Sequence, residues 1–561
     1  MYLRTVKSKT KSGVREYLQL CHNYREDGVS KTNVLYSFGR KDNLDLDQVR
    51  RLINSLCRLL PEEERLELEQ DNDLAGSFQF MGSSDLGGSY FLDQLWKRLM
   101  IDKTIKRLLR TRNYDTPIER LIFAMVANRA LAPSSKLHIE HWIDKKVYIP
   151  GLENVDVHQL YRAMDFLLEA AVTIQKDVFF SVANLFNLEV DLLFLDTTTT
   201  YFEIMQEDED SEESAGFRKR GFSKDNHPEL PQVVIAFAVT RSGIPVRCWV
   251  WPGNQSDQDI IEEVKKDLNS WKLNRVIMVA DSGFNSGENK KIMQGAGGNY
   301  IMGEKMRLGP KGTPAEALKA KGRYKKLDNG LEIKDVIMGG DSEARKRYII
   351  VRNPDEAKYD RNRRNDIIQE VKTRLKELKE LEGQPHEKAA CELRAHSTFG
   401  RYIRQTKTGK LRLNKTKIRL EEKYDGKYLI SSSDDWMSAE DIVIGYKHLH
   451  EIERVFRDLK HLIDIRPIKH RLSQRIRAHV LLCWLSMLLI RVAENEADET
   501  WFQMKKKLSS IVLGVNQCSK GEIHESSPLS SEQKQLFKRL KLNTPPRYFK
   551  LPFTRNKKQK K

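Results

Sequence analysis

The sequence predicts an α/β protein whose central sheet is built from two separate segments of the chain. After residue 188 the spacing of apolar residues changes from helical to strand-like, in the runs EVDLLFLD, QVVIAFAVT and IPVRCWVW. The last two are joined by the turn RSG, and the helical QDIIEEVKKDLNSW and the strands RVIMVAD and NYIMGEK follow. After residue 427 the strand KYLISS and another helix resume the pattern. Strands that alternate with helices indicate a layered α/β fold.

Shifts in composition divide the chain further. We expect an N-terminal basic strand-rich module, a helical region, the first part of the α/β domain, a strand-rich insertion, the second part of the α/β domain and a C-terminal basic region. In that order they span residues 1–43, 44–187, 188–304, 305–427, 428–500 and 501–561. The charged stretch RNRRNDIIQEVKTRLKELKELEG in the insertion predicts a helix, either a solvated spacer or a basic arm on DNA, and its charge pattern favours the spacer.

The charge of the chain indicates a polyanionic partner. With 97 Lys and Arg against 79 Asp and Glu, the formal net charge is +18, and the chain ends in RNKKQKK. Nucleic acid fits this excess. A membrane fits poorly, because the apolar run VLLCWLSMLLI is far shorter than the roughly 20 residues that a membrane-spanning helix needs, and it reads as a buried core helix. No signal peptide is visible, so we expect a cytoplasmic, nucleoid-associated protein without a membrane partner.

The helix containing HEIERVFRDLKHL presents a glutamate beside an apolar stripe. The stripe has the alternating spacing of three and four residues that marks one buried face of a helix: Leu449, Ile452, Phe456, Leu459 and Ile463. Glu453 borders it. Taken alone, Glu453 is most simply read as the partner of Arg457 one turn later.

Two other acids follow apolar strands. Asp196 closes VDLLFLD and Asp281 closes RVIMVAD, at positions from which side chains project beyond a sheet edge. Either one alone could simply cap a turn. The order of elements changes that interpretation, because a strand ending in Asp, a hairpin, a helix, a second strand ending in Asp and a helix with Glu is the layout of a ribonuclease-H-like fold. Folds of this type hold three carboxylates around divalent metal ions.

Three acids suit phosphodiester chemistry. Cleavage requires neutralisation of the phosphate charge, activation of the attacking oxygen and stabilisation of the leaving oxygen, which two Mg²⁺ ions about 4 Å apart can supply. Carboxylate oxygens hold such ions, which keep water and substrate oxygens in their remaining positions.

The same residues resemble a known family. Tyr446, Glu453 and Lys460 match three of the four positions in the Tyr-Arg-Glu-Lys signature of the DDE transposases of bacterial and archaeal insertion sequences. The blocks LFLDTTTTYFE, GFSKDNHPELPQVVIAFAV, PGNQSD, VADSGFNS and DGKYLISS are similar to the IS-four-type group of that family, which has an insertion domain. The resemblance covers roughly residues 1 to 500. It departs at Leu449, where the signature has an Arg able to grip a phosphate with two hydrogen bonds; Arg454 or Arg457 could take that role.

The resemblance implies a site and a reaction. Asp196, Asp281 and Glu453 would be catalytic and would bind Mg²⁺, or Mn²⁺, while Tyr446, Lys460 and Arg457 would contact DNA. The protein would bind the terminal inverted repeats of its element, cut the DNA with water as nucleophile, and join the 3′-hydroxyls to target DNA. Pairing of two ends implies a homodimer.

Two alternatives remain from the sequence. One is a nuclease of the same fold that only hydrolyses DNA. The other is a catalytically inactive, transposase-derived DNA-binding regulator, against which the intact Asp196, Asp281 and Glu453 argue.

Overall fold

The structure is a computed structural model. It describes residues 2–10, 13–26, 29–57, 79–188, 190–210, 215–273, 275–306, 313–339, 345–518 and 521–551. Two compact units are present. The larger unit, Ser83–Leu513 with Ser526–Arg547, contains the helical region and the large sheet.

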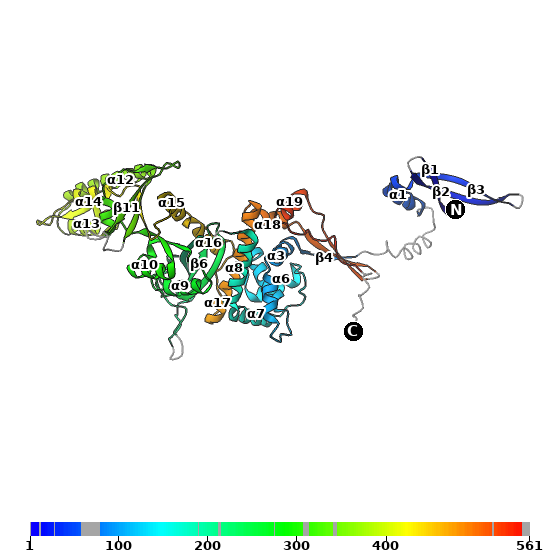
Figure 1. Ribbon diagram of the computed structural model, residues 1–561, viewed down its shortest axis with the longest axis horizontal. Coiled ribbons are helices and arrows are strands. Elements are labelled where there is room, and N and C mark those ends of the chain that lie inside the picture. The colour runs from blue at the N-terminus through cyan, green and yellow to red at the C-terminus, as the bar shows by residue number, and fades with distance from the viewer. Residues whose placement is uncertain are drawn as a thin grey trace. The chain divides into compact units, whose positions relative to one another are not determined.

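The N-terminal segment forms a three-stranded antiparallel sheet in the order β1-β2-β3 (Figure 1). Its strands span Tyr2–Thr10, Gly13–Glu26 and Val29–Arg40, and the short helix η1, Lys41–Asn43, and α1, Leu46–Cys57, follow. Glu16 on β2 pairs with Lys7 at 3.2 Å and with Lys41 at 2.9 Å. The three strands are longer than the short strands that we expected. The ion pairs of Glu16 neutralise part of the basic charge within this segment.

A second, four-stranded sheet was not predicted. Its order is β18-β17-β16-β4, and the strands span Tyr548–Lys550, Gly521–Ser526, Val512–Cys518 and Gln79–Asp85. β4 interrupts the segment that we expected to be wholly helical. The sequence FQFMGSSD has no sustained alternation of apolar and polar residues, and its polar half does not indicate a strand. α18, Trp501–Leu508, and α19, Ser531–Arg539, also lie in the predicted C-terminal basic region.

The predicted helical region contains six helices after β4 among the described residues. They are α3 Gly87–Arg98, α4 Ile101–Leu109, α5 Ile118–Leu131, α6 Lys136–Lys145, α7 Val157–Glu169 and α8 Ala171–Phe186. α17, Ser473–Ala497, packs against α5 and α7. The most apolar window of α17 is long enough to cross a membrane, but 94% of it is buried inside the protein. This confirms the prediction of a core helix.

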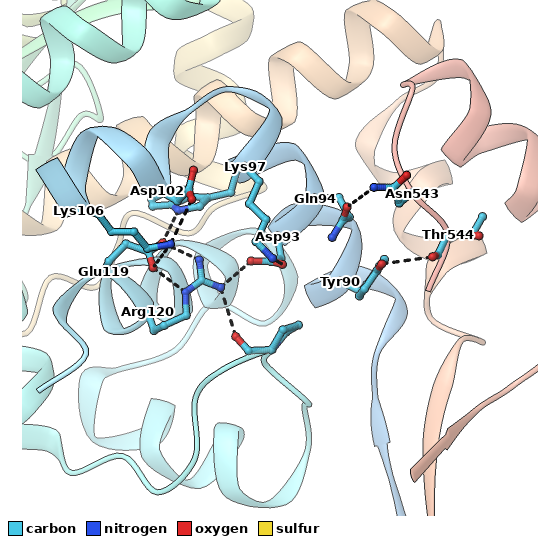
Figure 2. Close-up of polar contacts among 12 residues, drawn as sticks. Tyr90, Asp93, Gln94, Lys97, Asp102, Lys106, Glu119, Arg120, Asn543 and Thr544 are labelled. Carbon is cyan, nitrogen blue, oxygen red and sulfur yellow. Dashed lines mark hydrogen bonds and ion pairs between the residues drawn. The ribbon is translucent and has the colours of Figure 1, made fainter. Parts of the chain in front are cut away.

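A buried ion network ties α3 to α5 (Figure 2). Arg120 donates to Glu119 at 2.6 and 2.8 Å and to Asp93 at 2.6 Å, and the indole of Trp96 donates to Glu119 at 2.8 Å. Burial alone would raise the pKa of Glu119, but the hydrogen bond and charge of Arg120 outweigh it and lower that pKa. The guanidinium is therefore buried with its charge compensated.

Nine described strands form the large sheet, in the order β10-β11-β12-β15-β9-β8-β5-β6-β7. Its central strands are β5 Leu192–Tyr201, β6 Gln232–Val239, β7 Pro245–Pro252, β8 Ile277–Ala280, β9 Asn299–Glu304 and β15 Lys427–Ser432. β5, β6 and β7 are antiparallel to one another, whereas β5, β8 and β9 are parallel. All of these strands were predicted. They run through apolar sequence because helices cover both faces of the sheet.

Alternation along β5 and β8 assigns the two faces. Leu193, Leu195, Met278 and Ala280 belong to a core cluster with α9, Ile261–Ser270, and α10, Gly287–Gln294. Phe194 instead stacks on His448, between α15, Ala439–Lys447, and α16, Leu449–His461. One face of the central sheet therefore packs on α9 and α10, and the other on α15 and α16.

The insertion is richer in helix than we expected. Its elements are α11 Thr313–Lys319, β10 Lys325–Lys326, β11 Glu332–Met338, β12 Lys346–Arg352, α12 Pro354–Glu380, α13 Gly383–Ala395, η4 Gly400–Tyr402, β13 Ile403–Gln405, β14 Leu411–Leu413 and α14 Lys415–Glu422. The prediction of a strand-rich insertion was therefore wrong. Gly383 and Pro385 lie in the first turn of α13, where Pro costs no helical hydrogen bond. β12 pairs with β15, so the insertion also extends the central sheet.

We predict that Glu119→Gln lowers the free energy of unfolding by about 3 kcal/mol at neutral pH, because it removes one of the two carboxylates that compensate the buried Arg120. A carboxyl group with a lowered pKa stabilises the fold above its unfolded pKa, and this contribution is lost as the pH falls through the folded pKa. The difference between wild type and variant, measured by denaturant unfolding, should therefore shrink in acid. Glu140→Gln, at an exposed position on α6, is the control, with an expected change within about 0.5 kcal/mol. An unchanged stability for Glu119→Gln at neutral pH would contradict the role given to the network.

Candidate active site

Asp196 and Asp281 lie side by side on neighbouring strands. β5 and β8 are parallel, and Leu195 pairs with Ala280, so the next residue on each strand is one of the two aspartates. Asp281 follows the end of β8, as predicted, and its side chain caps no backbone N–H of the helical turn that begins there. The prediction that Asp196 ends its strand was wrong. β5 continues to Tyr201, because the β-branched threonines that follow pair with β6.

The pleat of the sheet directs both aspartates toward α15 and α16. Side chains alternate between the two faces along a strand. Each aspartate directly follows a residue of the cluster on α9 and α10, Leu195 or Ala280, so its own side chain faces the opposite side. Glu453 lies on α16, whose buried residues are Ile452, Val455, Phe456 and Leu459. All three predicted acids are therefore on elements that meet at one side of the sheet.

Tyr446 connects this side of the sheet with α15. Its hydroxyl donates to the Asp281 Oδ1 atom at 3.4 Å, and its ring stacks on Tyr428. Burial raises the pKa of Tyr446, and the negative charges of Asp281 and Glu453 raise this pKa further. A Cβ atom at Gly303 would lie 2.3 Å from the Tyr446 hydroxyl oxygen, so this approach requires glycine on β9. Tyr446 thus contacts Asp281 and also experiences the negative charge of Glu453.

Lys224 and Asp257 belong to the same site and were not assigned from the sequence. The Lys224 Nζ atom lies 3.4 Å from carboxylate oxygens of both Asp196 and Asp257, and it donates to the Thr197 carbonyl at 2.8 Å. Asp257 accepts from the Thr197 hydroxyl at 2.6 Å. Their signal was present in the blocks GFSKDNHPELP and PGNQSD, which the family resemblance included without giving their polar residues a role.

The electrostatics of Asp196 indicate a carboxylate that needs a cation. Burial raises its pKa to about 6, although Lys224 and the Thr197 N–H oppose this shift and Asp257 adds to it. One ammonium shared between two carboxylates does not fully compensate the lost hydration.

The predicted DNA contacts have different environments. Lys460 donates to Asp225 at 2.8 Å and its side chain is only 14% exposed, and Arg466 also donates to Asp225, at 3.1 Å. Arg457 is exposed, and its Nε atom lies 4.0 Å from Oδ1 of Asp458. The alternative interpretation, in which Glu453 pairs with Arg457, is not supported by any contact between them in the described part of the chain.

Leu449, the first residue of α16, occupies the position where the family signature has an arginine. Leu449 is partly buried there. Of the two arginines that could substitute for it, Arg454 donates to Glu494 at 3.3 Å, whereas Arg457 extends into solvent. The geometry therefore favours Arg457 over Arg454 as a phosphate contact.

The acids of the site fit a hard divalent cation by their chemistry. Asp196 and Asp281 offer carboxylate oxygens from adjacent strands, and the raised pKa of Asp196 shows a negative charge that is incompletely compensated. Within the described ranges, however, no group of three or more His, Cys, Asp or Glu side chains is arranged to hold a metal ion. Lys224 already provides positive charge at Asp196, and the negative charge of Glu453 acts on Tyr446.

Comparison with known proteins identifies two domains. Residues 3–68 match the model described as IS1634 family transposase, N-terminal domain, and residues 212–489 match the model described as Transposase DDE domain. The second match includes Asp281 and Glu453 but begins after Asp196. The finer grouping expected from the sequence, the IS-four-type group, stays a prediction.

No curated protein matches the chain. Among solved structures, one similar chain is that of the "Cryo-EM structure of piggyBac transposase synaptic complex with hairpin DNA (SNHP)", at 9% identity and a TM-score of 0.34, covering 75% of this chain and 79% of that one. The two domain matches together span more than half of the sequence. A DDE transposase domain implies an enzyme that cleaves DNA and transfers strands, and such enzymes generally use divalent metal ions. The chain carries a DDE transposase domain at residues 212–489 and the N-terminal domain of the IS1634 transposase family at residues 3–68.

Proposed function

We propose that this protein binds the terminal inverted repeats of its own element, cuts the DNA at those ends and joins the freed 3′-hydroxyls to target DNA. The observation that carries the proposal is the adjacent pair Asp196 and Asp281, on the side of the sheet covered by the helix with Glu453. The strand order β7-β6-β5-β8-β9, antiparallel and then parallel, supports a ribonuclease-H-like core.

The residues take separate roles in this proposal. Asp196, Asp281 and Glu453 would hold Mg²⁺ or Mn²⁺, which would supply neutralisation of the phosphate and stabilisation of the leaving oxygen. Tyr446 positions the Asp281 carboxylate through its hydrogen bond. Lys224 keeps Asp196 and Asp257 together by reducing their mutual repulsion.

DNA recognition is distributed over several parts of the chain in this proposal. Arg457 is available to a phosphate, and Lys460 would exchange Asp225 for one. The N-terminal module supplies further cations such as Arg4, whose side chain is exposed. The predicted contacts of the tail RNKKQKK lie outside the described residues. Pairing of two ends in a homodimer before cutting completes the proposal.

The first prediction from this proposed function concerns metal binding. Mg²⁺ or Mn²⁺ should raise the melting temperature of the wild-type protein, because a ligand bound only to the folded state at a hundred times its Kd stabilises by about 2.7 kcal/mol. Asp281→Asn should abolish most of that increase in thermal unfolding. Glu451→Gln, on α16 beside His450, is the matched control and should retain it. An equal metal-induced increase in Asp281→Asn would remove Asp281 from the metal site.

The second prediction separates binding from chemistry. Glu453→Gln should reduce cleavage of DNA carrying the element's ends by at least about a hundredfold, equivalent to about 2.7 kcal/mol of barrier. Binding to the same DNA should persist, since affinity comes chiefly from many phosphate contacts. Gel-shift and cleavage assays on one preparation measure both, with Glu451→Gln as control. Loss of binding together with cleavage in a folded variant would give Glu453 a structural role.

The rival functions appear as distinct outcomes of that cleavage assay. Hydrolysis of the ends without any joining of a 3′-hydroxyl to target DNA would favour a nuclease. Binding of ends by the wild type without cleavage in Mg²⁺ or Mn²⁺ would favour an inactive regulator.

The third prediction concerns the N-terminal module. Deletion of residues 1–43 should lower the affinity for end DNA and make it less dependent on salt, because each phosphate neutralised on duplex DNA contributes a slope of about −0.9. Metal-induced stabilisation should remain, since Asp196 and Asp281 lie on the large sheet. Unchanged affinity and salt slope would show that the module does not bind DNA.

A further inference from the structure

A cavity of about 690 Å³ lies in the larger unit, lined by the N-terminus of α6, α5 and the segment between α16 and α17. Four Lys or Arg side chains line it, namely Arg129, Lys136, Arg466 and Lys469, whereas Asp464 is the single acid in its lining. At its mouth Leu137 is 68% exposed. The cavity is therefore open to solvent and strongly positive.

Its two buried cations, Arg129 and Lys136, form no direct ion pair with a carboxylate among the described residues. Lys136 is 4% exposed, and its side-chain ammonium makes no hydrogen bond or ion pair in the part of the chain that the structure describes. Arg129 is equally buried, and its guanidinium donates only to the carbonyls of Asp464 and Ser134. Among the described residues its Nε atom has no partner, and neither has the Nδ1 atom of His479. Burying charges and donors in this way costs free energy unless an anion compensates them.

The start of α6 adds donors to the same cavity. α6 begins at Lys136 after Ser135, and no side chain caps its first N–H groups. The N-terminus of a helix carries free N–H groups and a positive partial charge, which favour a phosphate. Burial, with the charge of Arg129, lowers the pKa of Lys136 to about 7. A bound anion would reverse that shift and restore a full charge on the lysine.

The edge of the cavity connects with the candidate active site. Arg466 lines the cavity and donates to Asp225, which also accepts from Lys460. Asp225 follows Lys224, the residue that bridges Asp196 and Asp257. A DNA strand whose phosphate entered the cavity would therefore pass next to the loop that contacts Asp196.

We infer that this cavity, centred on Lys136, Arg129 and the start of α6, is a phosphate-binding site that holds a backbone phosphate of the DNA substrate beside the reacting strand. The inference rests on the proposed function, because it takes DNA as the source of the phosphate. An isolated inorganic phosphate offers the same chemistry, so the experiment has one arm for each source.

The first arm uses inorganic phosphate. Thermal unfolding of the full chain is compared in phosphate and in chloride at equal pH and ionic strength. Phosphate should raise the melting temperature of the wild type and of Lys145→Met, at an exposed lysine near the other end of α6. It should not raise that of Lys136→Met. In chloride, Lys136→Met should be at least as stable as the wild type, because the variant loses an uncompensated buried charge, whereas a merely structural lysine would leave it less stable.

The second arm uses end DNA over a series of salt concentrations. Lys136→Met and Lys469→Met, the latter at an exposed position that folding tolerates, should each weaken binding about tenfold, the effect of losing one charged hydrogen bond. Each should also reduce the salt slope by about 0.9. Lys145→Met should match the wild type.

Each other result overturns a defined part of the inference. If phosphate stabilises Lys136→Met as much as it stabilises the wild type, the cavity is not a phosphate-binding site. Loss of that stabilisation with unchanged DNA binding would show a site for free phosphate and overturn the assignment to DNA. If the wild type binds but never cuts end DNA, the proposed function fails, while the binding differences among the variants still decide on the phosphate site.

Discussion

The parallel pairing of β5 with β8 is the constraint on which the candidate site depends. Up to Leu195 and Ala280, β5 and β8 are buried and consist of apolar residues. Leu195 pairs with Ala280, and β8 stops there, so Asp196 and Asp281 emerge together at the same edge. The side on which they emerge follows from the pleat and is the side of α15 and α16.

That placement brings carboxylates close together, and a lysine side chain reduces the repulsion between them. Asp196 and Asp257 would repel each other across a partly buried space, and Lys224 lies between them. The compensation is partial, as the raised pKa of Asp196 shows. A divalent cation would compensate Asp196 more fully than the single ammonium of Lys224 does.

Sequence patterns predicted the central strands, the α16 helix and the candidate acids, because buried strands and amphipathic helices have strong local periodicity. They failed where pairing is not local. Asp196 was placed at a strand end because it directly follows a near-continuous apolar run, whereas the strand continues through threonines whose partner strand begins more than 30 residues later at Gln232. Lys224 and Asp257 lie in loops, and no periodicity marks a loop residue that folds back onto a strand. The four-stranded sheet joins β4 to strands from the C-terminal region and has no local signal of its own.

Two arginines on α5 show how the charge of one helix is divided between folding and binding. Arg120 is surrounded by Glu119 and Asp93, so its burial is compensated within the fold. Arg129 lies at the other end of the same helix, is also buried, and contacts only carbonyl oxygens and an open cavity that it shares with Lys136. Replacing buried charges by apolar residues of similar volume is often neutral or stabilising, so packing alone does not require a charge at Lys136 or Arg129. The retained charges there are therefore better explained by an anionic ligand than by packing, and in a DDE transposase the abundant anion is the phosphate of DNA.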